Sequence, residues 1–131
     1  MQRKNLAIVD TNVLIYDLLE NSEFHEISRK LLDNLDRMLI LPNIIVEFIL
    51  VSKRLKIPKD TIISKVKEIL DNSIIIHILK SDITTAITLN INEINDSLLV
   101  AVAKRLNLSV ISFDKDVEKL GEKLGEKVIH G

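Results

Sequence analysis

Three aspartates stand where one apolar segment gives way to another, and their carboxylates could act together in chemistry. Asp10 and Asp114 each follow a short apolar run, and Asp96 opens an apolar helical stretch. An acid at such a junction either caps the following helix or takes part in a ligand site, because the first N–H groups of a helix are unpaired. A functional role therefore requires that several of these acids meet.

Glu47 is the fourth acid of interest, because it is the only charged residue between Arg37 and Lys53. Burying an unpaired carboxylate in so apolar a segment costs several kcal/mol. We therefore expect Glu47 to face a solvated cleft, a cation or a metal ion. A narrow solvent-facing side of its helix is the alternative.

The elements that would position these acids alternate along the chain. Short apolar runs predict strands over 6–9, 38–41, 74–79, 109–113 and 127–130. Apolar residues at helical spacing predict helices after residue 11, over 22–35, 43–55, 59–70, 81–89 and 95–106, and around Val117. This alternation predicts one three-layer α/β/α domain over 1–131 with a central, mainly parallel sheet.

Parallel strands would bring the four acids to one edge of the sheet, where the strands end and ligands bind. Carboxylates gathered there repel one another and acquire raised pKa values unless cations are present. Mg²⁺ or Mn²⁺ fits such a site, because both ions prefer oxygen ligands and keep several waters. The four acids are Asp10, Glu47, Asp96 and Asp114.

The composition excludes several other classes of protein. No cysteine is present, so disulfides and thiolate metal sites are excluded. All three glycines lie after residue 120, which leaves no glycine-rich loop for a nucleotide cofactor. The net charge of −1 gives no global attraction for nucleic acid or membrane. Apolar stretches too short to cross a membrane and the absence of a signal-peptide pattern predict a cytoplasmic protein.

The segments around the four acids resemble the motif regions of PIN-domain ribonucleases, in that family's order. They are VDTNVLI around Asp10, LPNIIVEF around Glu47, NDSLLVAVAKRLNL around Asp96 and VISFDKDV around Asp114. The resemblance spans essentially the whole chain, whose compact size is most similar to the VapC-type toxins of toxin–antitoxin pairs. It implies a central parallel sheet, an acidic Mg²⁺ or Mn²⁺ site, endonucleolytic cleavage of RNA, an antitoxin partner and a homodimer.

The resemblance also implies roles for individual residues. Asp10, Glu47, Asp96 and Asp114 match the acids of the family's metal site, and Asp116 matches a position that is acidic in some members. Either Asp114 or Asp116 would make the closer metal contact. Thr11 and Asn12 would orient Asp10 or a bound water.

The sequence gives only weak indications of which residues contact RNA. Lys53, Arg54 and Lys115 are candidate phosphate contacts, and a solvated surface is an equally good reading of their charges. Most of the four aromatic residues occupy apolar helical or strand positions, so the sequence predicts no platform for base stacking. We therefore expect recognition through RNA shape and backbone.

Other functions use similar residues. A ribosomal-RNA processing nuclease would share the acids, and a non-catalytic PIN-like binding or scaffold module could retain them for stability. A phosphatase of the haloacid dehalogenase type requires a second Asp two positions after Asp10, where this chain has Asn12. A response-regulator receiver domain needs an acidic pair near the first strand and a Lys on a later one, and the sequence offers no convincing set.

Overall fold

The computed structural model describes residues 5–125 and 127–130, in which strands and helices alternate. The elements are β1 (Leu6–Val9), α1 (Thr11–Leu18), α2 (His25–Asp33), β2 (Arg37–Ile40), α3 (Pro42–Arg54), α4 (Lys59–Asp71), β3 (Ser73–Ile75), α5 (Lys80–Asn90), the 3₁₀ helix η1 (Ile91–Glu93), α6 (Ile94–Leu106), β4 (Ser109–Ser112), α7 (Lys115–Leu124) and β5 (Val128–His130).

Two predicted elements extend several residues beyond the observed ones. The strand predicted over 74–79 pairs only through β3, and the amide of Ile76 makes one last bond to the carbonyl of Ile40. Past Ile40 the neighbouring chain turns into α3, so the remaining apolar residues have no strand to pair with. The helix predicted over 22–35 begins at His25, because residues 22–24 form a turn in which Ser22 Oγ accepts from the Phe24 amide.

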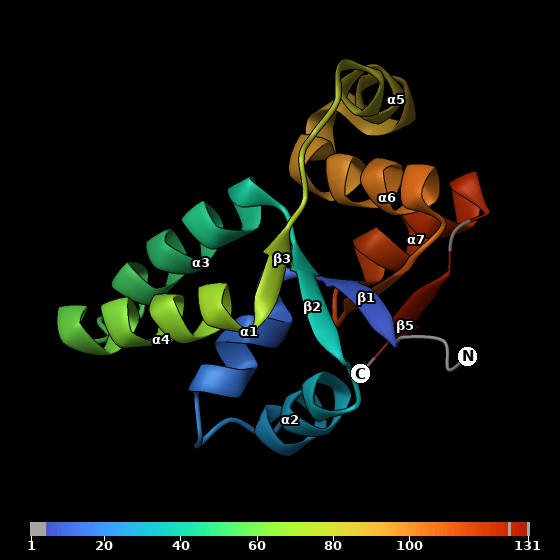
Figure 1. Ribbon diagram of the computed structural model, residues 1–131. Helices are drawn as coiled ribbons and strands as arrows, with labels where there is room; N and C mark the ends of the chain where they lie inside the picture. Colours follow the sequence, from blue (N-terminus) through green and yellow to red (C-terminus); the bar gives the residue numbers. More distant parts are fainter. Residues whose placement is uncertain (1–4, 126, 131) are drawn as a thin grey trace.

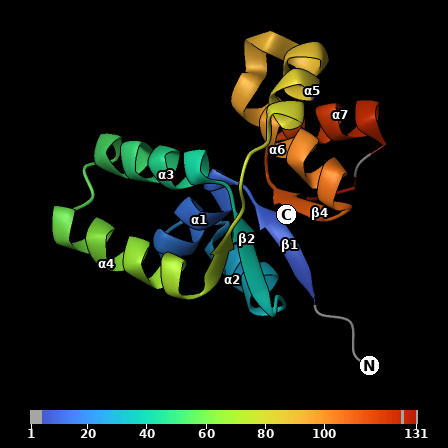
Figure 2. The same cartoon turned by 45° about the horizontal axis from the view of Figure 1, so that its top comes forward.

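The described strands form a sheet of five strands in the order β3-β2-β1-β4-β5, and all four pairings are parallel. The predicted three-layer α/β/α class is therefore confirmed. Helices α1 to α4 cover one face of the sheet, and α5 to α7 cover the other (Figure 1). A second view shows α3 beside α4 on one side of the molecule and α5 stacked on α6 on the other (Figure 2).

The strand order creates a switch point between β1 and β4. From β1 the chain moves outward through β2 to β3, and from β4 it moves the opposite way to β5. Right-handed crossovers then place the two sets of helices on opposite faces, which leaves a crevice at the carboxyl ends of β1 and β4. Asp10 and Asp114 lie beside these two ends.

The core is aliphatic, as the composition predicts. Strands β1, β2 and β4 each contribute fully or nearly fully buried residues, which suits a parallel sheet covered on both faces. Phe48 of α3 is the one fully buried aromatic side chain among the described residues. In that same part of the chain, no helix combines the length and the apolarity that crossing a membrane would require.

Ion pairs join neighbouring helices within the layers, and two of them have a buried acid at short distance. Asp17 of α1 and Lys65 of α4 are both buried, and Lys65 Nζ lies 2.5 Å from Asp17 Oδ2. Arg105 of α6 donates from Nε to Asp82 Oδ1 of α5 at 2.9 Å, which helps to fix α5 above α6. Asp17 also lines a cavity of about 320 Å³ near the amino ends of β2 and β3, whose lining carries both acidic and basic side chains.

Candidate active site

A cavity of about 230 Å³ opens at the carboxyl edge of the sheet, beside the switch point. All four acids singled out in the sequence line it, although they come from four separate parts of the chain. The described lining consists of Asp10, Thr11, Asn12, Ile15, Tyr16, Glu47, Val51, Asp96 and Asp114. The parallel sheet thus brings together side chains that the sequence spaces widely.

Asp10 both caps α1 and lies at the base of this cavity. Its Oδ1 accepts a hydrogen bond from the Thr11 amide at 2.7 Å, and its Oδ2 accepts one from Ser112 Oγ at 2.7 Å. The side chain is almost completely buried. Burial raises the pKa of Asp10 to about 6, against the lowering effect of these two hydrogen bonds and with a further raising effect from Glu47 and Asp114.

Asp96 lies in the first turn of α6, on the other side of the sheet. Burial is the main cause that raises its pKa to about 7, and repulsion from the acids across the cavity adds to it, with Asp10 the largest contributor. Glu47 enters from the second turn of α3, as predicted. The ionised forms of Asp10 and Asp96 are therefore destabilised in this cavity, and a bound cation would stabilise them.

The donor set suits a hydrated hard cation. The acidic lining offers carboxylate oxygens, and Mg²⁺ in proteins is commonly held by one or two carboxylates with waters completing its shell. No group of three or more Asp, Glu or His side chains within residues 5–125 and 127–130 is arranged to hold one ion. The four acids share a cavity without forming a closed cage, which fits an ion that keeps its waters.

Asp114 and Asp116 occupy different positions. Asp114 lines the cavity and caps α7, and its Oδ1 accepts from the Asp116 amide at 2.8 Å. Asp116 is exposed in the first turn of α7 and does not belong to the described cavity lining. The resemblance left open which of these two acids would be closer to a metal ion, and Asp114 is the one that lies beside the other carboxylates.

Sequence reasoning missed Ser112, the last residue of β4. Its buried hydroxyl donates to Asp10 and accepts from the Asp114 amide at 3.0 Å, so it links two of the acids. A polar residue at the end of an apolar run, two positions before an acid, is the only signal of this role in the sequence.

The two residues after Asp10 also line the cavity, and each makes one hydrogen bond there. Thr11 binds Asp10 through its backbone amide, whereas its buried hydroxyl has no hydrogen-bond partner within the described part of the chain. Asn12 Oδ1 accepts from the Phe113 amide at 3.2 Å. Asn12 thereby ties the turn between β4 and α7 to the start of α1, and its role toward Asp10 or a bound water stays a prediction.

Lys53 and Arg54 are exposed in the last turn of α3, close in sequence to the cavity-lining Val51. Lys115 is exposed at the start of α7, directly after Asp114. Their role in binding phosphate stays a prediction.

Replacing Ser112 by alanine should impair the site through Asp10. The change removes a hydrogen bond that lowers the pKa of Asp10, so that pKa should rise and the acid limb of a cleavage pH profile should move to higher pH. We expect a loss of activity of about 10- to 100-fold, typical of removing a group that orients a metal ligand. Ser112→Thr should retain most of the activity.

Ser109→Ala is the matched control, because Ser109 lies on the same strand at its opposite end. An equal loss of activity in Ser109→Ala, or an unshifted pH profile in Ser112→Ala, would contradict this role.

A parallel sheet with an acidic cavity at its switch point defines the class as an α/β protein with its candidate site at the carboxyl edge of the sheet. A family model described as PIN domain matches residues 7–123, and the chain belongs to this family. No curated protein matches the sequence.

Solved structures share the fold at low sequence identity. VapC20 of Mycobacterium tuberculosis, described as a sarcin-ricin loop cleaving toxin, has a TM-score of 0.76 and 13% identity, over 89% of this chain and 95% of its own. VapBC2 of Rickettsia felis, bound to a DNA fragment from its promoter, has a TM-score of 0.71 and 15% identity, over 95% and 98%. VapBC-1 of nontypeable Haemophilus influenzae has a TM-score of 0.69 and 15% identity, over 95% and 97%.

Proposed function

We propose that this chain is a divalent-metal-dependent endoribonuclease that hydrolyses RNA phosphodiester bonds in the acidic cavity. The observation that carries the proposal is the meeting of four carboxylates in one cavity, where burial and mutual repulsion raise the pKa values of Asp10 and Asp96. Such an arrangement lowers the stability of the folded state, and acids with shifted pKa values in a cavity are typical of functional sites. Membership of the PIN domain family supports the same reading.

Asp10 and Asp96 are the residues we expect to hold Mg²⁺ or Mn²⁺, with Asp114 close to a second position. A bound divalent ion supplies positive charge for the phosphate and lowers the pKa of a water. The contacts from Ser112 and Thr11 hold the Asp10 carboxylate in a fixed orientation. Glu47, which reaches the same cavity from α3, can accept a proton from a water there.

We further propose that the chain is the toxin of a toxin–antitoxin pair, acts in the cytoplasm and forms a homodimer. The similar structures include VapBC complexes and a toxin described as cleaving the sarcin-ricin loop. Apolar side chains exposed on α3 and α5 offer surface for an antitoxin or a second copy. They include Val46, Leu50, Ile83 and Ile87.

Cleavage of a mixed pool of structured RNAs should test the nuclease. We expect cutting with Mg²⁺ or Mn²⁺ and none with EDTA. Because the described cavity lining contains no histidine to activate a 2′-hydroxyl, the products should carry 5′-phosphates. Cyclic 2′,3′-phosphate ends that persist in chelator would overturn the mechanism.

The melting temperature measured with and without metal separates the remaining outcomes, because a ligand that binds only the folded state stabilises it. Stabilisation by metal without cutting would indicate an intact site offered the wrong RNA. Neither cutting nor stabilisation would favour the scaffold function.

A further inference from the structure

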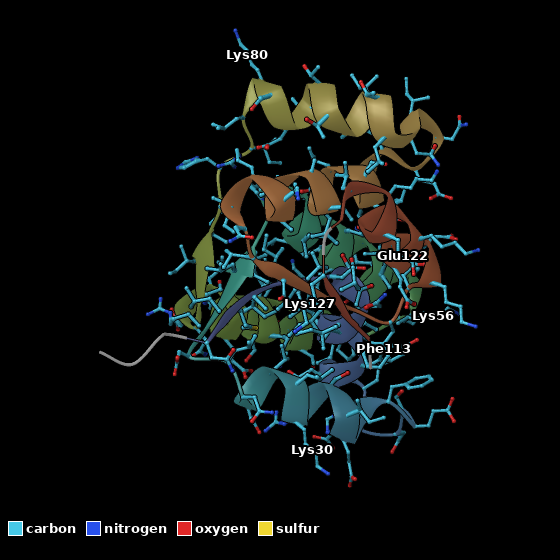
Figure 3. All side chains as sticks on the ribbon, turned by 90° about the vertical axis from the view of Figure 1, so that its right-hand side faces the viewer. Lys30, Lys56, Lys80, Phe113, Glu122 and Lys127 are labelled. Carbon is cyan, nitrogen blue, oxygen red and sulfur yellow. The ribbon has the colours of Figure 1, made fainter. Side chains whose placement is uncertain are left out.

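Three of the four aromatic residues gather at the side of the acidic cavity. Tyr16 comes from α1, Phe24 from the turn before α2, and Phe113 from the turn after β4. Their ring centroids are 4.9 to 5.3 Å apart. Figure 3 shows Phe113 between α7 and the region of α1 and α2. The sequence predicted no such group, because these residues meet only in the folded chain.

Tyr16 links this aromatic group to the site, since it lines the same cavity as Asp10 and Asp114. All three rings are only partly buried. The rings meet at angles of 48°, 88° and 50°, so none of them lies flat on another. A planar ligand could therefore lie against an exposed ring face without displacing a stacked neighbour.

The backbone that carries the Tyr16 ring is also held in place. His25 Nδ1 lies 3.0 Å from the carbonyl oxygen of Tyr16, which ties the end of α1 to α2. The bond from the Phe113 amide to Asn12 fixes the turn that carries Phe113. A ring positioned by a helix and by packed neighbours is better preorganised for binding than one on a free loop.

The two walls of the cavity differ in chemistry. The carboxylates, with a cation, suit a phosphate group, whereas an aromatic wall suits an uncharged planar group. Nucleobases stack on aromatic side chains in proteins that bind single-stranded nucleic acid. We propose that Tyr16 stacks on an unpaired nucleobase next to the phosphate that is cleaved. The proposal rests on the proposed nuclease function and makes Tyr16 a residue that positions the RNA in that site.

Tyrosine fluorescence gives a direct test, because Tyr16 is the only tyrosine and the chain has no tryptophan. A short single-stranded RNA would be titrated into the Asp96→Asn variant in Mg²⁺, so that the RNA stays intact. An abasic oligomer of the same length is the control for charge, and free N-acetyltyrosinamide is the control for light absorbed by the RNA. We expect quenching by the base-bearing RNA and none by the abasic oligomer.

Equal quenching by both oligomers, or quenching by neither, would overturn the proposal. The readout does not require catalysis. If the wild-type chain failed to cut RNA while base-dependent quenching persisted, the stacking site would stand and the proposed nuclease function would fall.

Steady-state cleavage provides a second test. Tyr16→Leu should raise KM by about 5- to 100-fold with a smaller change in kcat, which is the range expected for loss of one stacked base. Tyr16→Phe keeps the ring and should restore KM. Leu18→Ala, on the same helix but outside the described cavity lining, is the control for packing. If Leu18→Ala raised KM as much as Tyr16→Leu at an equal loss of melting temperature, the role of Tyr16 would be structural and the proposal overturned.

Discussion

Asp96→Asn is expected to abolish metal-dependent cleavage and, at the same time, to stabilise the metal-free protein. Loss of a charged group that acts on the reacting centre costs about 100- to 1,000-fold in rate, and Asp96 is in addition an expected metal-holding residue. The ionised Asp96 carboxylate also destabilises the folded state, because its pKa is raised from 3.8 to about 7.

The sign of the pH dependence follows from that shift. Between about pH 4 and pH 7 the folded state holds a proton on Asp96 more tightly than the unfolded state does. The free energy of unfolding therefore falls as the pH rises through this range, and the full cost is present above pH 7. Asn carries no charge, so Asp96→Asn should raise the melting temperature at pH 8 and change it little at pH 4.

The measurement is thermal unfolding at both pH values, with and without Mg²⁺. Mg²⁺ should stabilise the wild type and have less effect on the variant. Asp60→Asn is the matched control, because Asp60 lies in the first turn of α4, as Asp96 does in α6, but is exposed to solvent. It should slightly lower the melting temperature through the helix dipole and leave cleavage unchanged. Stabilisation of Asp60→Asn equal to that of Asp96→Asn would contradict the account.

Outside the acidic cavity, Lys65→Met should lower the free energy of unfolding more than any other single substitution of a charged residue. Lys65 and Asp17 have side chains only 9% and 8% exposed, and their pair joins α4 to α1. Removing the lysine leaves a buried carboxylate whose other cation, Arg29, lies 3.5 Å away and is 53% exposed. Breaking a buried pair in this way costs about 3–5 kcal/mol of the free energy of unfolding.

Urea denaturation would measure this loss. The double variant Lys65→Met/Asp17→Leu should recover most of it, because both charges are then absent from the interior. Lys67→Met is the control on the same helix, since Lys67 is exposed and should contribute less than about 1 kcal/mol. A loss in Lys65→Met no larger than in Lys67→Met would show that the buried pair contributes little.

Much of the fold could be predicted because its signals are local. The apolar run before Asp10 marks a strand, and Pro42 fits the first position of α3, where its missing N–H is not needed. The family resemblance is confirmed by the match over residues 7–123. Strand length was less predictable: the run from Ile74 looks uniform in sequence, but pairing stops where β2 ends.

The site was predictable only in part. Acids at strand ends are conspicuous, so Asp10 and Asp114 could be found from the sequence. Ser112 could not, because a hydroxyl in a strand has the same appearance whether it faces solvent or a carboxylate 102 positions away. The aromatic group depends in the same way on packing between distant turns, such as those of Phe24 and Phe113.

The placement of β1 beside β4 has a consequence during protein synthesis. Asp10 emerges from the ribosome early, but its amide bonds to the Ile111 carbonyl and its carboxylate to Ser112 only after β4 has been made. A nascent chain that has not reached β4 also lacks Asp114 and one wall of the cavity. If the chain cuts RNA as proposed, the cutting site stays incomplete during synthesis until β4 and Asp114 have been translated.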